Sequence, residues 1–180
     1  MPAGEKFGKN TINHKIYARH QGVAADARLS IPLIKQCIRG ALQIEGVDLP
    51  CEVSVLIADD HSIRELNREF RGVDKPTDVL SFPVQEFSQP GWAARDSDSL
   101  HQEAGLLPLG DIILSAQRVD KQAREHAQTR ESETAYLTVH SVLHLLGYDH
   151  IDEAEEKKRM REREKDIIYK LRIGRGSKKI

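Results

Sequence analysis

The sequence has no long apolar run, few cysteines and almost no net charge, and each of these features excludes a class of protein. No stretch approaches the roughly 20 apolar residues that a membrane-spanning helix needs, so we expect no membrane partner. The first ten residues, MPAGEKFGKN, contain no apolar core of a signal peptide, which predicts a cytoplasmic protein. Two cysteines in 180 residues provide no disulfide framework, in agreement with a reducing compartment.

The remaining composition is that of a soluble globular chain. Hydrophobic residues make up 39% and charged residues 31%, which is too apolar for a disordered protein. A chain of 180 residues is long enough to bury one core. We therefore expect a single domain over residues 1–180, with a loose N-terminus at 1–10 and a basic C-terminal tail at 172–180.

The net charge of −1 conceals an uneven distribution of charge near the C-terminus. Residues 149–156 contain five acids, whereas residues 157–180 contain eleven Lys or Arg and three acids. Acids at the start of a helix and bases toward its end favour the helix dipole, which explains part of this pattern. The rest of the basic excess, especially in RIGRGSKKI, is compatible with contacts to phosphates and equally with a solvated tail.

Three histidines occur at a spacing that suits a single metal ion. His140 and His144 are four residues apart, which places both imidazoles on one face of a helix. Gly147 can end this helix in a left-handed conformation, so that His150 returns as a third ligand. The residues between the histidines are almost all apolar, which predicts a helix that runs through the core.

Three imidazoles without a fourth protein ligand are typical of a catalytic zinc site, because structural zinc is usually held by four side chains. Neither Cys37 nor Cys51 is near this motif in the sequence. We therefore predict one Zn²⁺ per chain, held by His140, His144 and His150. Three neutral ligands leave the full charge of the zinc in place, which suits an anionic phosphodiester.

Three motifs resemble the YbeY family of single-strand endoribonucleases and rRNA maturation factors. They are HSVLHLLGYDH at 140–150, LNREFRGVDKPTDVLSFPV at 66–84 and LGDIILS at 109–115, and they occur in the order of the family. The likeness covers about residues 12–170. One departure is Ser141, where the family commonly has glycine after the first histidine.

The resemblance implies a zincin-like metal helix that crosses the sheet, and an enzyme that cleaves single-stranded RNA. It further implies late rRNA processing at the 3′ end of 16S rRNA and ribosome quality control, with the small ribosomal subunit as partner and no DNA substrate. Zincin proteases carry glutamate directly after the first histidine as general base, whereas this chain has Ser141. A hydroxyl is too weak a base for that task, so peptide hydrolysis is disfavoured. The sequence leaves open whether metal hydroxide or the RNA 2′-hydroxyl attacks.

Arg71 is the residue that we predict to act beside His140 in catalysis and to bind the substrate. It lies in the segment FRGVDKPTDVLSF, and the resemblance implies that this arginine faces the metal. Asp149 is a candidate to accept a hydrogen bond from a metal-binding imidazole and so to orient it, or to cap the next helix. Asp78 and Ser81 are candidates for the cleft wall, although polar residues also suit a turn after Pro76.

The order of the remaining patterns predicts an α+β fold, with a small mixed sheet of about four strands packed with helices. A possible edge strand precedes residue 20, and Ser30 caps a first helix that ends by Gly46. Apolar and β-branched residues at 51–59 predict a strand that is buried on both faces. The further predictions are a helix from Asp59 or Asp60 to Gly72, an edge strand at 79–84, a long surface loop at 86–107, a strand at 110–115, a helix to about 126, the histidine helix, and a charged helix at 152–171.

Two other functions are compatible with the same motifs. The first is a metal-dependent hydrolase that acts on another phosphate or on a small molecule. The second is a ribosome-associated factor whose metal is structural and which contributes binding alone. A ligand variant that still folds and binds but no longer processes RNA would separate the nuclease from the binding factor.

Overall fold

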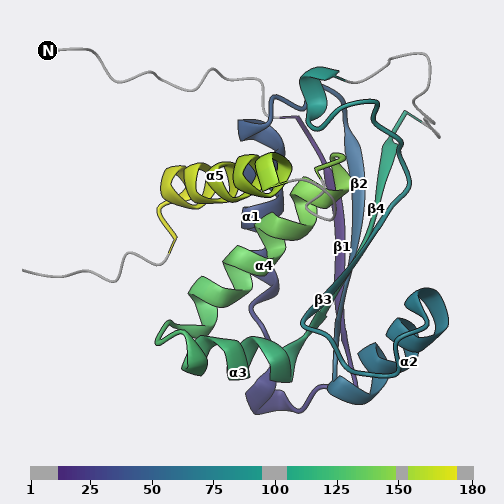
Figure 1. Cartoon of the computed structure of the whole chain (residues 1–180), viewed down its shortest axis with the longest axis vertical. Coiled ribbons are helices and arrows are strands. Elements are labelled where there is room, and N and C mark those ends of the chain that lie inside the picture. Colours follow the sequence, from purple (N-terminus) through teal and green to yellow (C-terminus); the bar gives the residue numbers. More distant parts are fainter. Residues whose placement is uncertain (1–11, 95–104, 149–153, 174–180) are drawn as a thin grey trace, which may run out of the picture.

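The computed structural model of the chain describes residues 12–94, 105–148 and 154–173 (Figure 1). Four strands form one sheet, and they are β1 (Lys15–Gln21), β2 (Cys51–Ala58), β3 (Val79–Pro83) and β4 (Leu107–Ser115). Five α-helices accompany them, namely α1 (Ile31–Ile44), α2 (Asp60–Arg71), α3 (Ala116–Glu125), α4 (Arg130–Leu145) and α5 (Ala154–Leu171). Two short 3₁₀ turns, η1 (Ala25–Ala27) and η2 (Trp92–Ala94), lie in the connections.

The strands follow the order β1-β2-β4-β3 across the sheet. β1 and β2 are parallel, as are β2 and β4, whereas β3 is antiparallel to β4. The prediction of a single domain with a small mixed sheet is therefore confirmed, and both predicted edge strands lie at the edges. Pro83 is the last residue of β3, where a missing amide hydrogen is tolerated.

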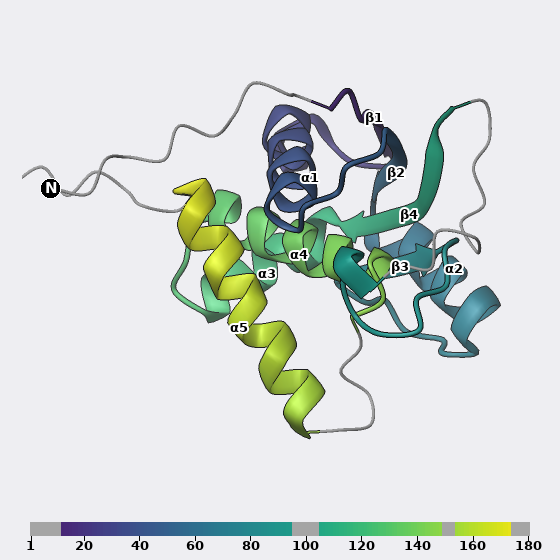
Figure 2. The same ribbon diagram turned by 90° about the horizontal axis from the view of Figure 1, so that it is seen from above.

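The helices cover the two faces of the sheet unequally. Figure 2 shows α1, α4 and α5 on one side of the sheet and α2 on the other. The main core lies on the first side, where the alternate residues Val53, Val55 and Ile57 of β2 are buried against α1 and α4. On the second side only a small cluster around Ile63 of α2 is buried.

This unequal cover corrects one prediction, because β2 is fully buried on only one face. Its residues alternate between buried and half-buried along most of the strand, up to the buried pair Ile57 and Ala58 at its end. A short helix such as α2 spans only part of a sheet face, so the other residues of that face keep contact with solvent. Residues 95–104 of the loop predicted at 86–107 lie outside the described residues, and the part before them differs from the prediction, since Trp92 is buried and its indole Nε1 donates to Asp48 Oδ1 at 2.8 Å.

The helix ends agree with the signals in the sequence. Ser30 Oγ accepts from the amide of Leu33, and Asp59 Oδ1 accepts from the amide of Ser62 at 2.8 Å, so both residues are N-caps. Gly72 is the C-cap of α2. β4 is longer than predicted, because Leu107 extends its pairing with β2.

Close packing fixes β3 against β4 at Gly110. A Cβ atom at this position would lie 2.1 Å from the carbonyl oxygen of Phe82, and the backbone φ is +136°. Only glycine fits such an approach without displacing the neighbouring strand. The edge strand β3 is thereby held at a defined place beside α4.

Candidate active site

α4 presents two histidines of the predicted motif on its partly exposed face. The Nε2 atoms of His140 and His144 are 3.1 Å apart, and the two rings are nearly perpendicular with centroids 4.6 Å apart. Two nitrogens that bind one tetrahedral zinc at about 2.0 to 2.1 Å lie about 3.3 Å from each other. The two imidazoles are therefore placed at nearly the separation that a shared metal ion requires.

Glu164 of α5 contacts His140 at Nδ1, the ring nitrogen that does not face His144. Its Oε1 lies 2.7 Å from His140 Nδ1, and its side chain is only 5% exposed. A buried carboxylate at this distance holds the proton on Nδ1, so the lone pair of the ring is on Nε2, the atom that faces His144. This arrangement of carboxylate and imidazole is common behind metal-binding histidines.

The end of α4 turns sharply after these histidines. Leu146 is its C-cap, and Gly147 follows with a φ of +81°. Tyr148 is buried, and its hydroxyl donates to Glu45 Oε2 at 2.9 Å, while the Arg163 guanidinium also binds this carboxylate. Burial raises the pKa of Tyr148 to about 12, so the phenol stays protonated as a donor. These contacts tie the end of the helix to α1 and α5.

His150 and Asp149, which follow this turn, lie outside the described residues. Within the parts of the chain that the structure describes, no group of three His, Cys, Asp or Glu side chains is arranged to hold a metal ion. Cys37 and Cys51 are buried, and burial raises the pKa of each thiol to about 12, so neither offers a thiolate. His140 and His144 are thus two of the three predicted ligands, and the complete set stays a prediction.

Arg71 lines the same cavity as the two histidines, but it belongs to α2, on the opposite side of the sheet from α4. It is the last residue of α2, its Nη2 donates to the backbone oxygen of Ser81 at 3.2 Å, and its guanidinium lies 5.8 Å from the ring centroid of Phe82. Both contacts direct the exposed arginine along the edge strand β3. The guanidinium makes no other hydrogen bond within the described part of the chain, so most of its donors remain available.

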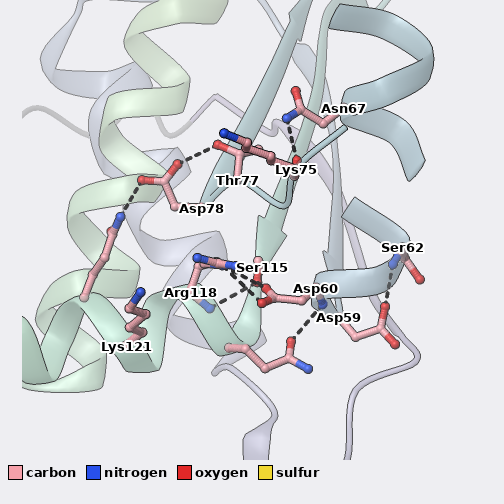
Figure 3. A network of polar contacts seen from close by, with 12 residues as sticks. Asp59, Asp60, Ser62, Asn67, Lys75, Thr77, Asp78, Ser115, Arg118 and Lys121 are labelled. Carbon is pink, nitrogen blue, oxygen red and sulfur yellow. Dashed lines mark hydrogen bonds and ion pairs between the residues drawn. The ribbon is translucent and has the colours of Figure 1, made fainter. Parts of the chain in front are cut away.

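A polar network holds α2 in position at its opposite end. The Asp60 carboxylate accepts from Ser115 Oγ at 2.6 Å and from Arg118 Nε at 3.1 Å, which joins the start of α2 to the start of α3 (Figure 3). Asn67 donates to the backbone oxygen of Lys75 and so fixes the turn after α2. The helix that carries Arg71 is therefore anchored at both ends.

Asp78 and Ser81, the two remaining candidates, have different surroundings. Asp78 Oδ1 accepts from Thr77 Oγ1 and from the amide of Val79, and its Oδ2 accepts from Gln122 at 2.8 Å (Figure 3). This carboxylate therefore already ties the start of β3 to α3. Ser81 Oγ is buried and has no hydrogen-bond partner among the described residues. A buried hydroxyl without a partner is uncommon in proteins and is a candidate contact for a ligand.

One cavity of about 490 Å³ joins these side chains. Among its lining residues are Arg71, Asp78, Ser81, His140 and His144. The structure thus brings together five of the seven predicted site residues, from α2, β3 and α4. A cation, two imidazoles and a hydroxyl in one cavity form a setting that suits an anionic substrate.

A family profile described as "Endoribonuclease YbeY" matches residues 16–172. The chain belongs to the YbeY family. Relatives named Endoribonuclease YbeY include the protein of Thermoanaerobacter sp. (strain X514), which is 45% identical over 143 residues, or 79% of this chain and 88% of the relative. The relative from Clostridium acetobutylicum is 43% identical over 162 residues, or 87% of this chain and 96% of the relative.

A solved structure supports the fold of this YbeY chain. The solution structure of a Thermotoga maritima protein matches with a TM-score of 0.57 at 29% identity, and the match covers 87% of this chain and 88% of that one. The resemblance predicted from three short motifs is therefore confirmed over most of the chain. YbeY proteins are named as endoribonucleases, enzymes that cleave phosphodiester bonds within RNA.

Ser141 has no chemical role in the cavity of this YbeY chain. It is fully buried, and its hydroxyl donates to the backbone oxygen of Leu137 at 2.8 Å. A small side chain that points into the helix packing leaves room for the core around α4. The position that bears the general base in zincin proteases is thus turned away from the histidines.

Sequence reasoning missed Glu164, although a signal was present. The residue lies 24 positions after His140, so no local spacing connects the two. On α5, however, it shares the buried face with Met160 and Ile167. A carboxylate between two apolar positions of one helix face indicates a buried acid, and a buried acid requires a partner.

Proposed function

We propose that this chain is a zinc-dependent endoribonuclease that cleaves single-stranded RNA. The observation that carries the proposal is the approach of the His140 and His144 Nε2 atoms to 3.1 Å, in a cavity that Arg71 also lines. His140, His144 and His150 are the proposed ligands, and Glu164 orients the first of them. A bound zinc would supply a Lewis acid for the phosphodiester and would activate water.

The protein side chains perform the remaining tasks. Arg71 binds the phosphate that is cleaved, since its planar fork can donate to two oxygens at once. Asp78 and Ser81 line the wall beside it, and the buried Ser81 hydroxyl has no hydrogen-bond partner among the described residues. Because Ser141 is buried and hydrogen-bonded to Leu137, no group is available at the position of the protease base.

Single-stranded rRNA is the substrate that we propose. A flexible strand can bend into a cavity of about 490 Å³, whereas a duplex holds its phosphates on a rigid cylinder. The proposed biological role is maturation of the 3′ end of 16S rRNA and ribosome quality control, on the small ribosomal subunit in the cytoplasm. No helix among the described residues is long and apolar enough to cross a membrane.

Purified protein loaded with zinc is expected to cleave single-stranded RNA and to leave matched duplex RNA, DNA of the same sequence and casein intact. The missing protease base accounts for casein, the rigid cylinder of a duplex accounts for duplex RNA, and the missing 2′-hydroxyl distinguishes DNA. Time courses on gels for the nucleic acids and release of soluble peptides for casein measure the rates. Rapid casein hydrolysis without RNA cleavage would overturn the proposal.

Glu164→Gln is expected to lower zinc affinity by about 10- to 100-fold, as is typical when the partner behind a metal-binding histidine is lost. The amide keeps the size of the carboxylate but no longer holds the Nδ1 proton by charge. Titration with a competing chelator measures the affinity directly, without any activity assay. Glu162→Gln on the exposed side of α5 is the matched control, and equal affinities for the two variants would remove Glu164 from the site.

A further inference from the structure

A groove leads away from the candidate active site along α5. It begins at a cavity of about 240 Å³ that His140, Tyr136, Lys157, Arg161 and Glu164 line. A larger cavity of about 900 Å³ continues it, shares Tyr136, Arg161 and Glu164, and adds Lys165 and the loop between α3 and α4. His140 lines both the first cavity and the catalytic one, so the groove and the candidate active site adjoin at this side chain.

Three bases follow the groove at a regular helical spacing. Lys157, Arg161 and Lys165 are four residues apart and exposed, so they form one stripe on α5 that we call the basic stripe. At 1.5 Å per residue the stripe is about 12 Å long. Figure 2 shows the helix that carries it beside α4. The stripe is thus long enough to follow several phosphates of an extended strand.

The bases of α5 fall into two groups, those with an acidic partner and those without one. Arg163 binds Glu45 and Asp166, and Lys170 binds Asp166, so these cations are already neutralised. None of the three stripe residues makes an ion pair within the described part of the chain. Lys158 and Arg159 are likewise without an ion pair among the described residues, but of these bases only the three stripe residues line the groove, where their charges are available to an external anion.

Both acids of the groove are buried, whereas the three bases are exposed, so the bases and not the carboxylates can contact a strand that lies in the groove. Glu164 contacts His140, and Glu133 lies 3.5 Å from His126 Nδ1 with its side chain 3% exposed. Tyr136 adds an aromatic side chain that is 39% exposed and whose ring centroid lies 6.0 Å from that of His140. Burial, together with the nearby Glu164 carboxylate, raises the pKa of Tyr136 to about 12, so the ring is neutral.

We propose that this groove is the track for the single-stranded RNA beside the cleaved bond. The basic stripe binds successive phosphates of the strand, and Tyr136 stacks on the base next to the cavity. Bases for the backbone and an aromatic ring for stacking are the two components of sites that bind single strands without sequence preference. This inference rests on the proposed function, which it extends from the cleaved phosphate to the flanking nucleotides.

The test compares two double variants of matched composition. Arg161→Gln with Lys165→Gln removes two charges from the groove, whereas Arg159→Gln with Lys170→Gln removes two charges from elsewhere on α5, outside both groove cavities. Binding of a labelled single-stranded RNA is measured in chelating buffer, so that no cleavage occurs. Over about 50 to 200 mM salt, loss of two phosphate contacts should reduce the slope of log K against log salt by about 1.4.

The groove variant is expected to bind long RNA roughly 10- to 100-fold more weakly at low salt, with the control near the unmodified protein. Turnover of a dinucleotide, which does not reach α5, should be unchanged in both. Equal affinities and slopes for the two variants would overturn the inference even if the unmodified protein cleaves RNA. If the unmodified protein binds long RNA through the groove but cleaves none, the proposed function fails and the track remains.

Discussion

His144→Ala is expected to lose most of its zinc and to cleave single-stranded RNA more than about 100-fold more slowly. Removal of a metal ligand should cost more than removal of the hydrogen-bond partner of a ligand, which typically lowers metal affinity or activity by about 10- to 100-fold. The change removes one of two imidazoles whose Nε2 atoms are 3.1 Å apart. His144 lines the cavity and is not part of the packed core, so the variant should fold. Elemental analysis of the purified protein gives the metal content, and circular dichroism confirms the fold.

The control for this variant is His61→Ala. His61 lies on α2 with its side chain 77% exposed, 3.9 Å from Glu65, and it does not line the cavity of the histidine pair. It should keep full zinc content and full activity. Unchanged zinc content in His144→Ala would show that the metal binds elsewhere, and the proposed ligand set would then be wrong.

Local signals in the sequence predicted the elements well. The caps at Ser30 and Asp59, the end of α2 at Gly72 and the histidine pair on one helix face depend on residues within one or two turns of each other. Such short-range interactions are determined by backbone sterics and hydrogen bonding alone. The family motifs added the expectation that Arg71 lies opposite the histidines.

Contacts between distant segments were not predictable in the same way. The buried bond from Glu164 to His140 and the network of Glu45, Tyr148 and Arg163 depend on how α5 crosses α1 and α4. A single sequence contains no period that relates these positions. The half-buried second face of β2 was missed for the same reason, since its cover depends on the length and placement of α2.

The charge pattern near the C-terminus is explained only in part by the contacts of α5. Part of the basic excess is helix design, because Arg163 and Lys170 form ion pairs with acids. The basic stripe of Lys157, Arg161 and Lys165 has no such partners among the described residues and borders the groove from His140. The tail sequence RIGRGSKKI lies outside the described residues beyond Ile173, so both explanations of its charge stay predictions, and the phosphate contact that we propose belongs to α5.

Arg71→Glu is expected to retain zinc and fold, but to cleave single-stranded RNA about 10²- to 10³-fold more slowly, the usual cost of losing one donor to a developing anion. Arg71 is exposed and makes only one hydrogen bond to the described residues, to the Ser81 backbone oxygen. In the proposed mechanism its charge instead offsets the negative charge that grows on the phosphate during cleavage. Arg71→Lys keeps the charge without the planar fork, so an intermediate rate is expected.

Arg68→Glu is the matched control, because it makes the same charge change one turn earlier on α2 and does not line the cavity. A general electrostatic effect on RNA approach would slow both variants alike and would weaken at high salt. A contact with the cleaved phosphate would slow Arg71→Glu alone, mainly through kcat, with the metal content unchanged. Cleavage by Arg71→Glu at the unmodified rate would leave the histidine-bound metal alone to recognise the phosphate.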